Sequence, residues 1–160
     1  MTAYIRAGGS GVDSAHPPVV AARCSDYDMV SLQAALRELL APLGGMSAFV
    51  KPGERIGLKP NILMGSAPEL AITTHPVLVG AVALAVKEAG GVPIVVESPG
   101  TGVAHARLPI ERAFRKAGYA EAAERYGFEL SLDTDWEMVS NPDAVLVKRL
   151  EVIGAIRRVD

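Results

Sequence analysis

The sequence has very little cysteine and little histidine. Cys24 is the single cysteine among 160 residues, and there are only 3 histidines. One cysteine cannot close an internal disulfide, and it cannot supply the thiolates of a zinc or iron–sulfur site. It fits a reducing compartment. We therefore expect no metal site and no cofactor bound by these residues themselves.

The sequence also lacks an excess of charge and any long hydrophobic run. Its 16 basic and 18 acidic residues give a net charge of -2, which is not the signature of a nucleic-acid or anionic-membrane binder. The longest apolar run, 77–86, is far shorter than the ~20 residues that span a bilayer. Residues 1–14 have no apolar core of a signal peptide. These absences predict a cytoplasmic protein with no nucleic-acid and no membrane partner.

What the chain does have is the composition of a globular protein. Hydrophobic residues make up 49% of it and charged residues 21%. A chain of this length can bury a substantial core. Glycines at 8, 9 and 11 indicate a flexible N-terminal arm over 1–18, and the α/β domain is expected over 19–160.

Strand-like and helix-like patterns alternate along that domain. Apolar residues at helical spacing, glycines after helices and β-branched runs mark the elements. The order predicts an α/β fold, with an open, mostly parallel sheet, helices on both faces and a β-hairpin near the C-terminus. The predicted strands are 19–23, 55–59, 92–97 and 128–132, the helices are 29–43, 77–89, 110–117 and 119–126, and the hairpin pairs 137–139 with 145–150.

Unusual polar residues follow the predicted strands or precede a helix. In open α/β sheets, ligands bind beyond the carboxyl ends of the strands, and a helix N-terminus favours an anion. A lysine, two threonines and close-approach glycines suit a small ligand bearing phosphate or carboxylate. The candidate ligand-binding residues are Lys59, Asn61, Thr73, Thr74, His75, Glu97, Ser98, Gly100 and Gly102.

Each candidate also has a simpler explanation. Thr74 could only cap the helix, Asn61 could belong to a turn, and Lys59 could be a solvated cation. Glu97, at the end of a buried strand, needs a partner, and Lys59 is one candidate. If the site is catalytic, His75 and Glu97 are the candidates for acid/base chemistry.

The motifs of several enzyme classes are absent. Residues 100–102 do not form a dinucleotide-binding fingerprint, and there is no P-loop. No nucleophile elbow surrounds Ser98, which argues against a hydrolase.

Six short segments, in order along the chain, resemble the domain-of-unknown-function family 362. They are CSDYD (24–28), FVKPGER (49–55), LKPNIL (58–63), TTHP (73–76), EAGG (88–91) and ESPG (97–100). Many members of that family carry a separate ferredoxin-like module with two [4Fe-4S] clusters. The resemblance therefore implies an association with low-potential electron transfer, through such a module or another electron-transfer partner.

The sequence departs from the family pattern in three ways. It has no ferredoxin cysteines, so [4Fe-4S] clusters are expected only if the full-length protein carries the module. Glu97 stands where the family usually has aspartate. Typical members continue past the position of Asp160 with another strand and a motif of lysine and histidine. The resemblance thus implies the N-terminal half of a longer family domain, or a truncated gene product.

Three functional hypotheses remain open. The favoured one is the ligand-binding part of an iron–sulfur-associated redox protein. The second is a cluster-independent enzyme that uses Lys59, His75 and Glu97. The third is a non-catalytic interaction scaffold, which could form homo-oligomers through an uncovered apolar face.

Overall fold

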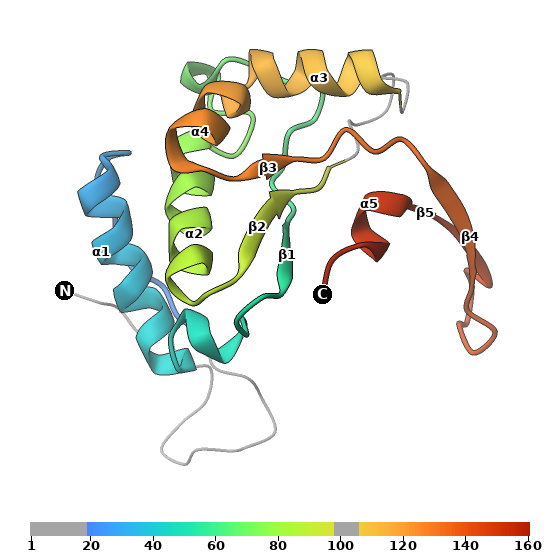
Figure 1. Ribbon diagram of the computed structural model, residues 1–160, viewed down its shortest axis with the longest axis horizontal. Helices are drawn as coiled ribbons and strands as arrows, with labels where there is room; N and C mark the ends of the chain where they lie inside the picture. Colours follow the sequence, from blue (N-terminus) through green and yellow to red (C-terminus); the bar gives the residue numbers. More distant parts are fainter. Residues whose placement is uncertain (1–18, 98–105) are drawn as a thin grey trace.

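The computed structural model describes residues 19–97 and 106–160 (Figure 1). The predicted arm, 1–18, and the predicted turn at 98–102 lie outside the described residues. The helices are α1 (Met29–Leu40), α2 (Pro76–Glu88), α3 (Arg107–Lys116), α4 (Tyr119–Tyr126) and α5 (Gly154–Arg157). The strands are β1 (Arg55–Leu58), β2 (Val92–Val95), β3 (Glu129–Leu130), β4 (Trp136–Ser140) and β5 (Arg149–Ile153).

The centre of the fold is a parallel sheet in the order β1-β2-β3. Leu58 pairs with Val95, and Val95 pairs with Leu130. Right-handed crossovers between strands in this order place their helices on one face. There α2, α3 and α4 enclose the main core, which includes Val79, Val95, Phe114 and Tyr119. The predicted α/β fold with a parallel sheet and a C-terminal hairpin is confirmed.

The opposite face of the sheet has a much thinner cover. Ile94 and Val96 pack there against Ala155 of α5, with Val159 beside them. Residue 57 is glycine because a Cβ atom would lie 2.9 Å from a methyl group of Val159. The backbone N–H of Asp160 donates to the carbonyl of Arg55 at 2.8 Å, which ties this segment to β1. Helices therefore lie on both faces, but unequally.

The strand predicted at 19–23 is wrong. These residues form no strand, and Val19 is 64% exposed. The physical reason is that residues 19–23 lead into helix α1, which lies outside the sheet layer. Helix α1 packs on α2 and not on the sheet, so the segment before it runs outside the sheet and meets no strand (Figure 1).

The predicted helices are confirmed, with small changes at their ends. Asp28 caps α1 by accepting hydrogen bonds from the N–H groups of Val30 and Ser31. Short 3-10 helices cover Ala41–Leu43, Met46–Ala48 and Pro68–Leu70. The break between α3 and α4 falls at Gly118, whose φ of +76° suits glycine.

The hairpin is confirmed, but its second strand is displaced toward the C-terminus. Trp136 pairs with Ile153 and Ser140 with Arg149, so residues 145–147 belong to the connection. A hydrophobic run indicates strand propensity but does not fix the pairing register, which the whole ladder decides.

Candidate functional site

The carboxyl edge of the sheet brings Lys59 and Glu97 together. Val96 N–H donates to the carbonyl of Leu58 at 2.9 Å, so the residues that follow β1 and β2 lie side by side. The Nζ atom of Lys59 is 2.7 Å from Oε2 of Glu97. The Glu97 side chain is 6% exposed, whereas that of Lys59 is 58% exposed. Lys59, which the sequence offered as one candidate partner of the strand-end glutamate, does form an ion pair with it.

Asn61 and Thr74 join the end of β1 to the start of α2. The N–H of Thr74 donates to the carbonyl of Asn61 at 2.9 Å, and the N–H of Asn61 donates to Oγ1 of Thr74 at 3.0 Å. The Asn61 amide also donates to the carbonyl of Ile72 at 3.3 Å. Both polar side chains are thus engaged in holding the loop.

His75, and not Thr74, is the N-cap of α2. Its Nδ1 accepts a hydrogen bond from the N–H of Val77 at 3.3 Å. Its ring stacks on Tyr27, with centroids 3.7 Å apart and planes 12° from parallel. Burial lowers the pKa of His75, and the negative charge of Glu69 opposes that shift. The imidazole is therefore held in its neutral form.

The N–H groups expected to receive an anion at the start of α2 already have acceptors. Pro76 has no N–H, and the N–H of Val77 bonds to the His75 ring. The N–H of Leu78 donates to the His75 carbonyl at 3.0 Å. What remains there for an anion is the positive end of the helix dipole.

Tyr119 belongs to this region, although sequence reasoning did not select it. Its hydroxyl donates to the carbonyl of Thr74 at 2.7 Å. Burial raises the pKa of Tyr119 to about 12, and the negative charge of Glu97 acts in the same direction. The only signal in the sequence is its position directly after the helix break at Gly118.

Thr73 has the one buried side-chain polar atom without a hydrogen-bond partner in the described part of the chain. The residue is 8% exposed, and its Oγ1 has neither a donor nor an acceptor beside it. An unsatisfied buried hydroxyl costs about 1–3 kcal/mol. Such a group calls for an explanation, and a ligand is one.

The carboxyl edge thus offers an ammonium next to a buried carboxylate, those of Lys59 and Glu97. The unpaired hydroxyl of Thr73 lies in the segment that leads into α2. His75 has other contacts, with Val77 and Tyr27. The remaining candidates, Ser98, Gly100 and Gly102, lie outside the described residues.

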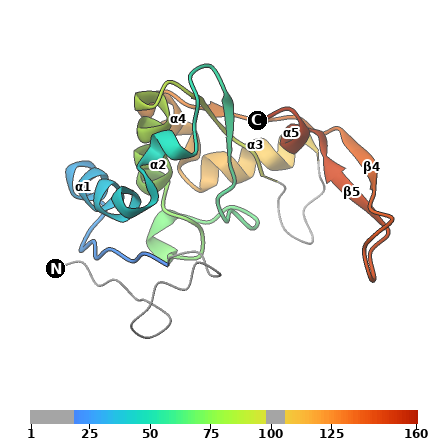
Figure 2. The same ribbon diagram turned by 90° about the horizontal axis from the view of Figure 1, so that it is seen from below.

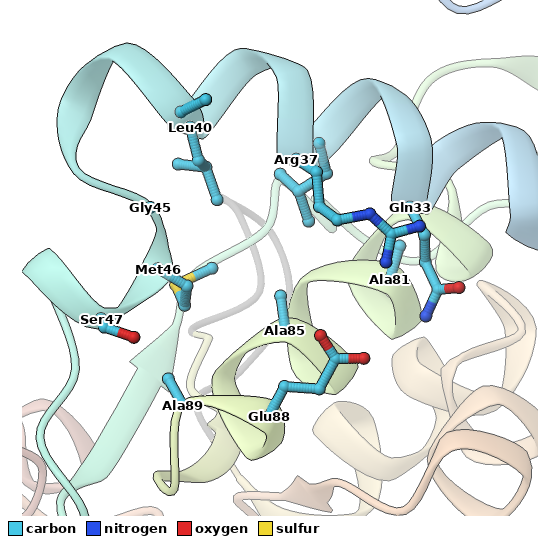
Figure 3. A pocket seen from close by; sticks show the side chains of 12 residues that line it. Gln33, Arg37, Leu40, Gly45, Met46, Ser47, Ala81, Ala85, Glu88 and Ala89 are labelled. Atoms are coloured by element: carbon cyan, nitrogen blue, oxygen red, sulfur yellow. The ribbon is translucent and has the colours of Figure 1, made fainter.

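A separate groove of about 300 Å³ lies between α1 and α2 (Figure 3). Arg37 and Leu40 of α1 line it, together with Met46 and, from α2, Ala85 and Glu88. These α2 residues belong to the C-terminal half of the helix, whereas the carboxyl edge of the sheet meets its N-terminal end. The groove is therefore distinct from the predicted site.

The residues of this chain do not fit an iron–sulfur cluster. A [4Fe-4S] cluster takes four cysteine thiolates, and Cys24 is exposed and single. Across 19–97 and 106–160, no three His, Cys, Asp or Glu side chains are grouped so that they could hold a metal ion. In the same ranges, no helix has the length and apolar character needed to cross a membrane.

The family model described as "Domain of unknown function (DUF362)" matches residues 56–160. The chain therefore belongs to this family, as the resemblance implied. Four of the six segments, from LKPNIL (58–63) onward, lie within the matched residues. It is also similar to the "Thylakoid-associated protein sll1697" of Synechocystis sp. (strain ATCC 27184 / PCC 6803 / Kazusa), with 52% identity over 82 residues. That stretch covers 51% of this chain and 26% of the relative. No solved structure matches the chain.

Proposed function

We propose that the carboxyl edge of the sheet binds a small anionic ligand through a carboxylate or phosphate group. The carrying observation is the position of Lys59, whose side chain is 58% exposed while its Nζ atom lies 2.7 Å from the buried Glu97 carboxylate. An ammonium has three N–H donors, so one bond to Glu97 leaves two for a ligand. The negative charge of Glu97 does not attract an anion. Binding should therefore depend strongly on the positive charge of Lys59.

The Thr73 hydroxyl supports the same proposal. A ligand oxygen would give this buried group the partner that it lacks. Asn61 and Thr74 act indirectly, because their mutual hydrogen bonds position the loop that carries Thr73. Direct ligand contacts of Ser98, Gly100 and Gly102 remain predictions from the sequence.

The geometry favours binding over acid/base catalysis by His75. A neutral imidazole has one acceptor nitrogen, and here Nδ1 uses it for the N–H of Val77. The other nitrogen then carries the proton and can only donate. A catalytic base at His75 would require the opposite tautomer and would break the helix cap.

An iron–sulfur association is proposed on the family resemblance only. Because this chain has one cysteine, we assign any cluster to a ferredoxin-like module or a separate electron-transfer partner. The cytoplasm remains the predicted location. The similar Synechocystis protein is named as thylakoid-associated, so association with thylakoids is a second location to test.

Calorimetry with inorganic phosphate and with a panel of small carboxylates tests the ligand proposal. We expect Lys59→Ala to weaken binding by about 10- to 100-fold, the range for losing a charge-assisted hydrogen bond. The control is Lys51→Ala, which removes an equally flexible cation whose side chain is 85% exposed and pairs with Glu54.

A second variant guards against destabilisation by the Glu97 carboxylate when its ion pair with Lys59 is lost. Lys59→Met combined with Glu97→Gln removes both charges and leaves no buried ion alone. If this folded variant binds as tightly as the native chain, the proposal is wrong. Equal losses in the Lys59 and Lys51 variants would indicate non-specific attraction and would also contradict it.

A further inference from the structure

The hairpin of β4 and β5 projects from the rest of the molecule (Figures 1 and 2). Among the residues that the structure describes, it forms a sheet of only two strands. An isolated two-stranded ribbon is marginally stable in water, and its open edges can pair with another strand. Large apolar side chains on it are exposed, with Val145 at 92% and Leu146 at 87%. The hairpin therefore has the features of a docking element.

The pairing register shows which backbone groups face outward on β5. The bonds Asn141 N–H to Lys148 carbonyl and Gly154 N–H to Asp135 carbonyl flank the ladder. Because hydrogen-bonded pairs alternate in an antiparallel ladder, the even-numbered residues of β5 bond to β4. The N–H and C=O groups of Arg149, Glu151 and Ile153 point away, and no strand pairs with them in the described part of the chain.

We propose that a second copy of this chain docks on this edge. The two β5 strands run antiparallel about a two-fold axis at Leu150 and build a four-stranded sheet with β4 on each outer side. In this register Arg149 lies opposite Glu151 of the partner subunit, and the symmetry repeats the pair. Leu150 meets its own copy on the axis and loses its exposure to water.

Charge complementarity selects this register over its neighbours. Outward-facing groups can also pair if the axis moves by one residue along β5. An axis at Glu151 would place two glutamates directly opposite each other, and an axis at Arg149 would do the same with two arginines. The Lys148 ammonium does not compete, because it donates to the Pro142 carbonyl of its own hairpin at 2.7 Å.

The same register explains the apolar tip of the hairpin. It places Leu146 of the partner subunit opposite Gly154, directly beyond the ladder. Exposed Ile156 and Trp136 lie at that end of the hairpin. The most exposed hydrophobic residues of each copy would therefore lie near exposed apolar residues at the base of the other hairpin. Burial of this apolar surface would favour the dimer.

The edge of β4 offers no comparable match. Its outward-facing residues are Trp136, Met138 and Ser140, none of which is charged. The nearby Glu137 is already paired with Arg157. Pairing through β4 would therefore lack the opposite charges that fix a register.

Analytical ultracentrifugation of the full chain over a range of concentrations tests the proposal. We expect a reversible dimer for the native chain. Arg149→Glu and Glu151→Arg should each weaken it at least about tenfold, because each places like charges opposite each other twice. Within the hairpin, these residues face Ser140 and Met138, so neither variant removes an ion pair inside one copy.

Restoration of the charges distinguishes pairing from loss of fold. The double variant R149E/E151R should dimerise again, and a mixture of the two single variants should form heterodimers. A native chain that stays monomeric, or single variants that dimerise like the native chain, would overturn the proposal. So would failure of both the double variant and the mixture to restore the dimer.

Discussion

At the scale of single residues, hydrogen bonding separates structural from functional candidates near the start of α2. Asn61 and Thr74 bond to each other, and His75 caps the helix. A polar group with such partners must give them up before it can bind a ligand, at a cost in free energy. Lys59 and Thr73 differ, because one retains free donors and the other has no partner. These two residues therefore carry the ligand proposal: Lys59 through its remaining donors and Thr73 through its unpaired hydroxyl.

The lowered pKa of His75 predicts a dependence of stability on pH. Since burial lowers this pKa in the folded state, the unfolded chain binds the proton more readily. The contribution of His75 to stability is present above about pH 6.5, the ordinary value, and is lost as the pH falls through the folded-state pKa. Protonation of Nδ1 would also remove the acceptor that caps α2.

The matched variant is His75→Asn, which keeps a capping oxygen but does not titrate. Urea unfolding at several pH values between about 5 and 7.5 should show a smaller loss of stability on acidification for this variant than for the native chain. The other two histidines are common to both proteins. Parallel pH profiles would contradict the role assigned to His75.

At the scale of elements, α2 connects the core to the candidate site. Its N-terminus lies at the carboxyl edge of the sheet, and its buried residues Val79, Ala83 and Val86 pack against the core or the neighbouring elements. Gly80 lets α4 approach α2, because a Cβ atom there would lie 2.7 Å from Cε2 of Tyr126. The close packing of these two helices therefore depends on one missing methyl group.

Gly80→Ala should destabilise the protein by about 1–3 kcal/mol, as overpacking does, although alanine favours a helix by about 1 kcal/mol over glycine. Urea unfolding measures the difference. In a Tyr126→Ala background the ring is absent, and the same substitution should become neutral or stabilising. Equal effects in both backgrounds would show that the ring contact does not matter.

At the scale of the whole molecule, the two faces of the sheet are protected very differently. Three helices and a large core cover one face, whereas α5 and the residues after it cover the other. The thin layer is tied down at Asp160, whose N–H donates to the Arg55 carbonyl and whose carboxylate accepts from the Arg55 N–H, and by the packing of Val159 over Gly57. Small disturbances there should expose the second face to water.

Ala155→Asp tests that layer. A carboxylate placed beside Ile94 and Val96 would be buried without a partner, so we expect a loss of more than about 2 kcal/mol in the free energy of unfolding. Ala34→Asp, at an exposed position of α1, controls for the lower helix propensity of aspartate. Similar losses for both variants would mean that α5 does not cover the sheet.

Local patterns in the sequence determined the elements themselves. The spacing of leucines predicted α1, the glycine at 118 predicted the break before α4, and the apolar run after Gly91 predicted β2. The Lys59–Glu97 pair could be anticipated because parallel strands end at the same edge. Such features depend on neighbours in the chain or on one rule of topology.

Only the tertiary structure decided the rest, because each remaining feature depends on a partner distant in sequence. Val19 and Val20 form no strand because none of the strands in 19–97 and 106–160 lies beside them, and the register of β5 depends on its ladder with β4. His75 caps the helix by accepting from the Val77 N–H, whereas the Thr74 hydroxyl accepts a hydrogen bond from the N–H of Asn61. Tyr119 lies at the candidate site because its hydroxyl donates to the Thr74 carbonyl, 45 residues away in the chain. No local pattern in the sequence encodes this contact.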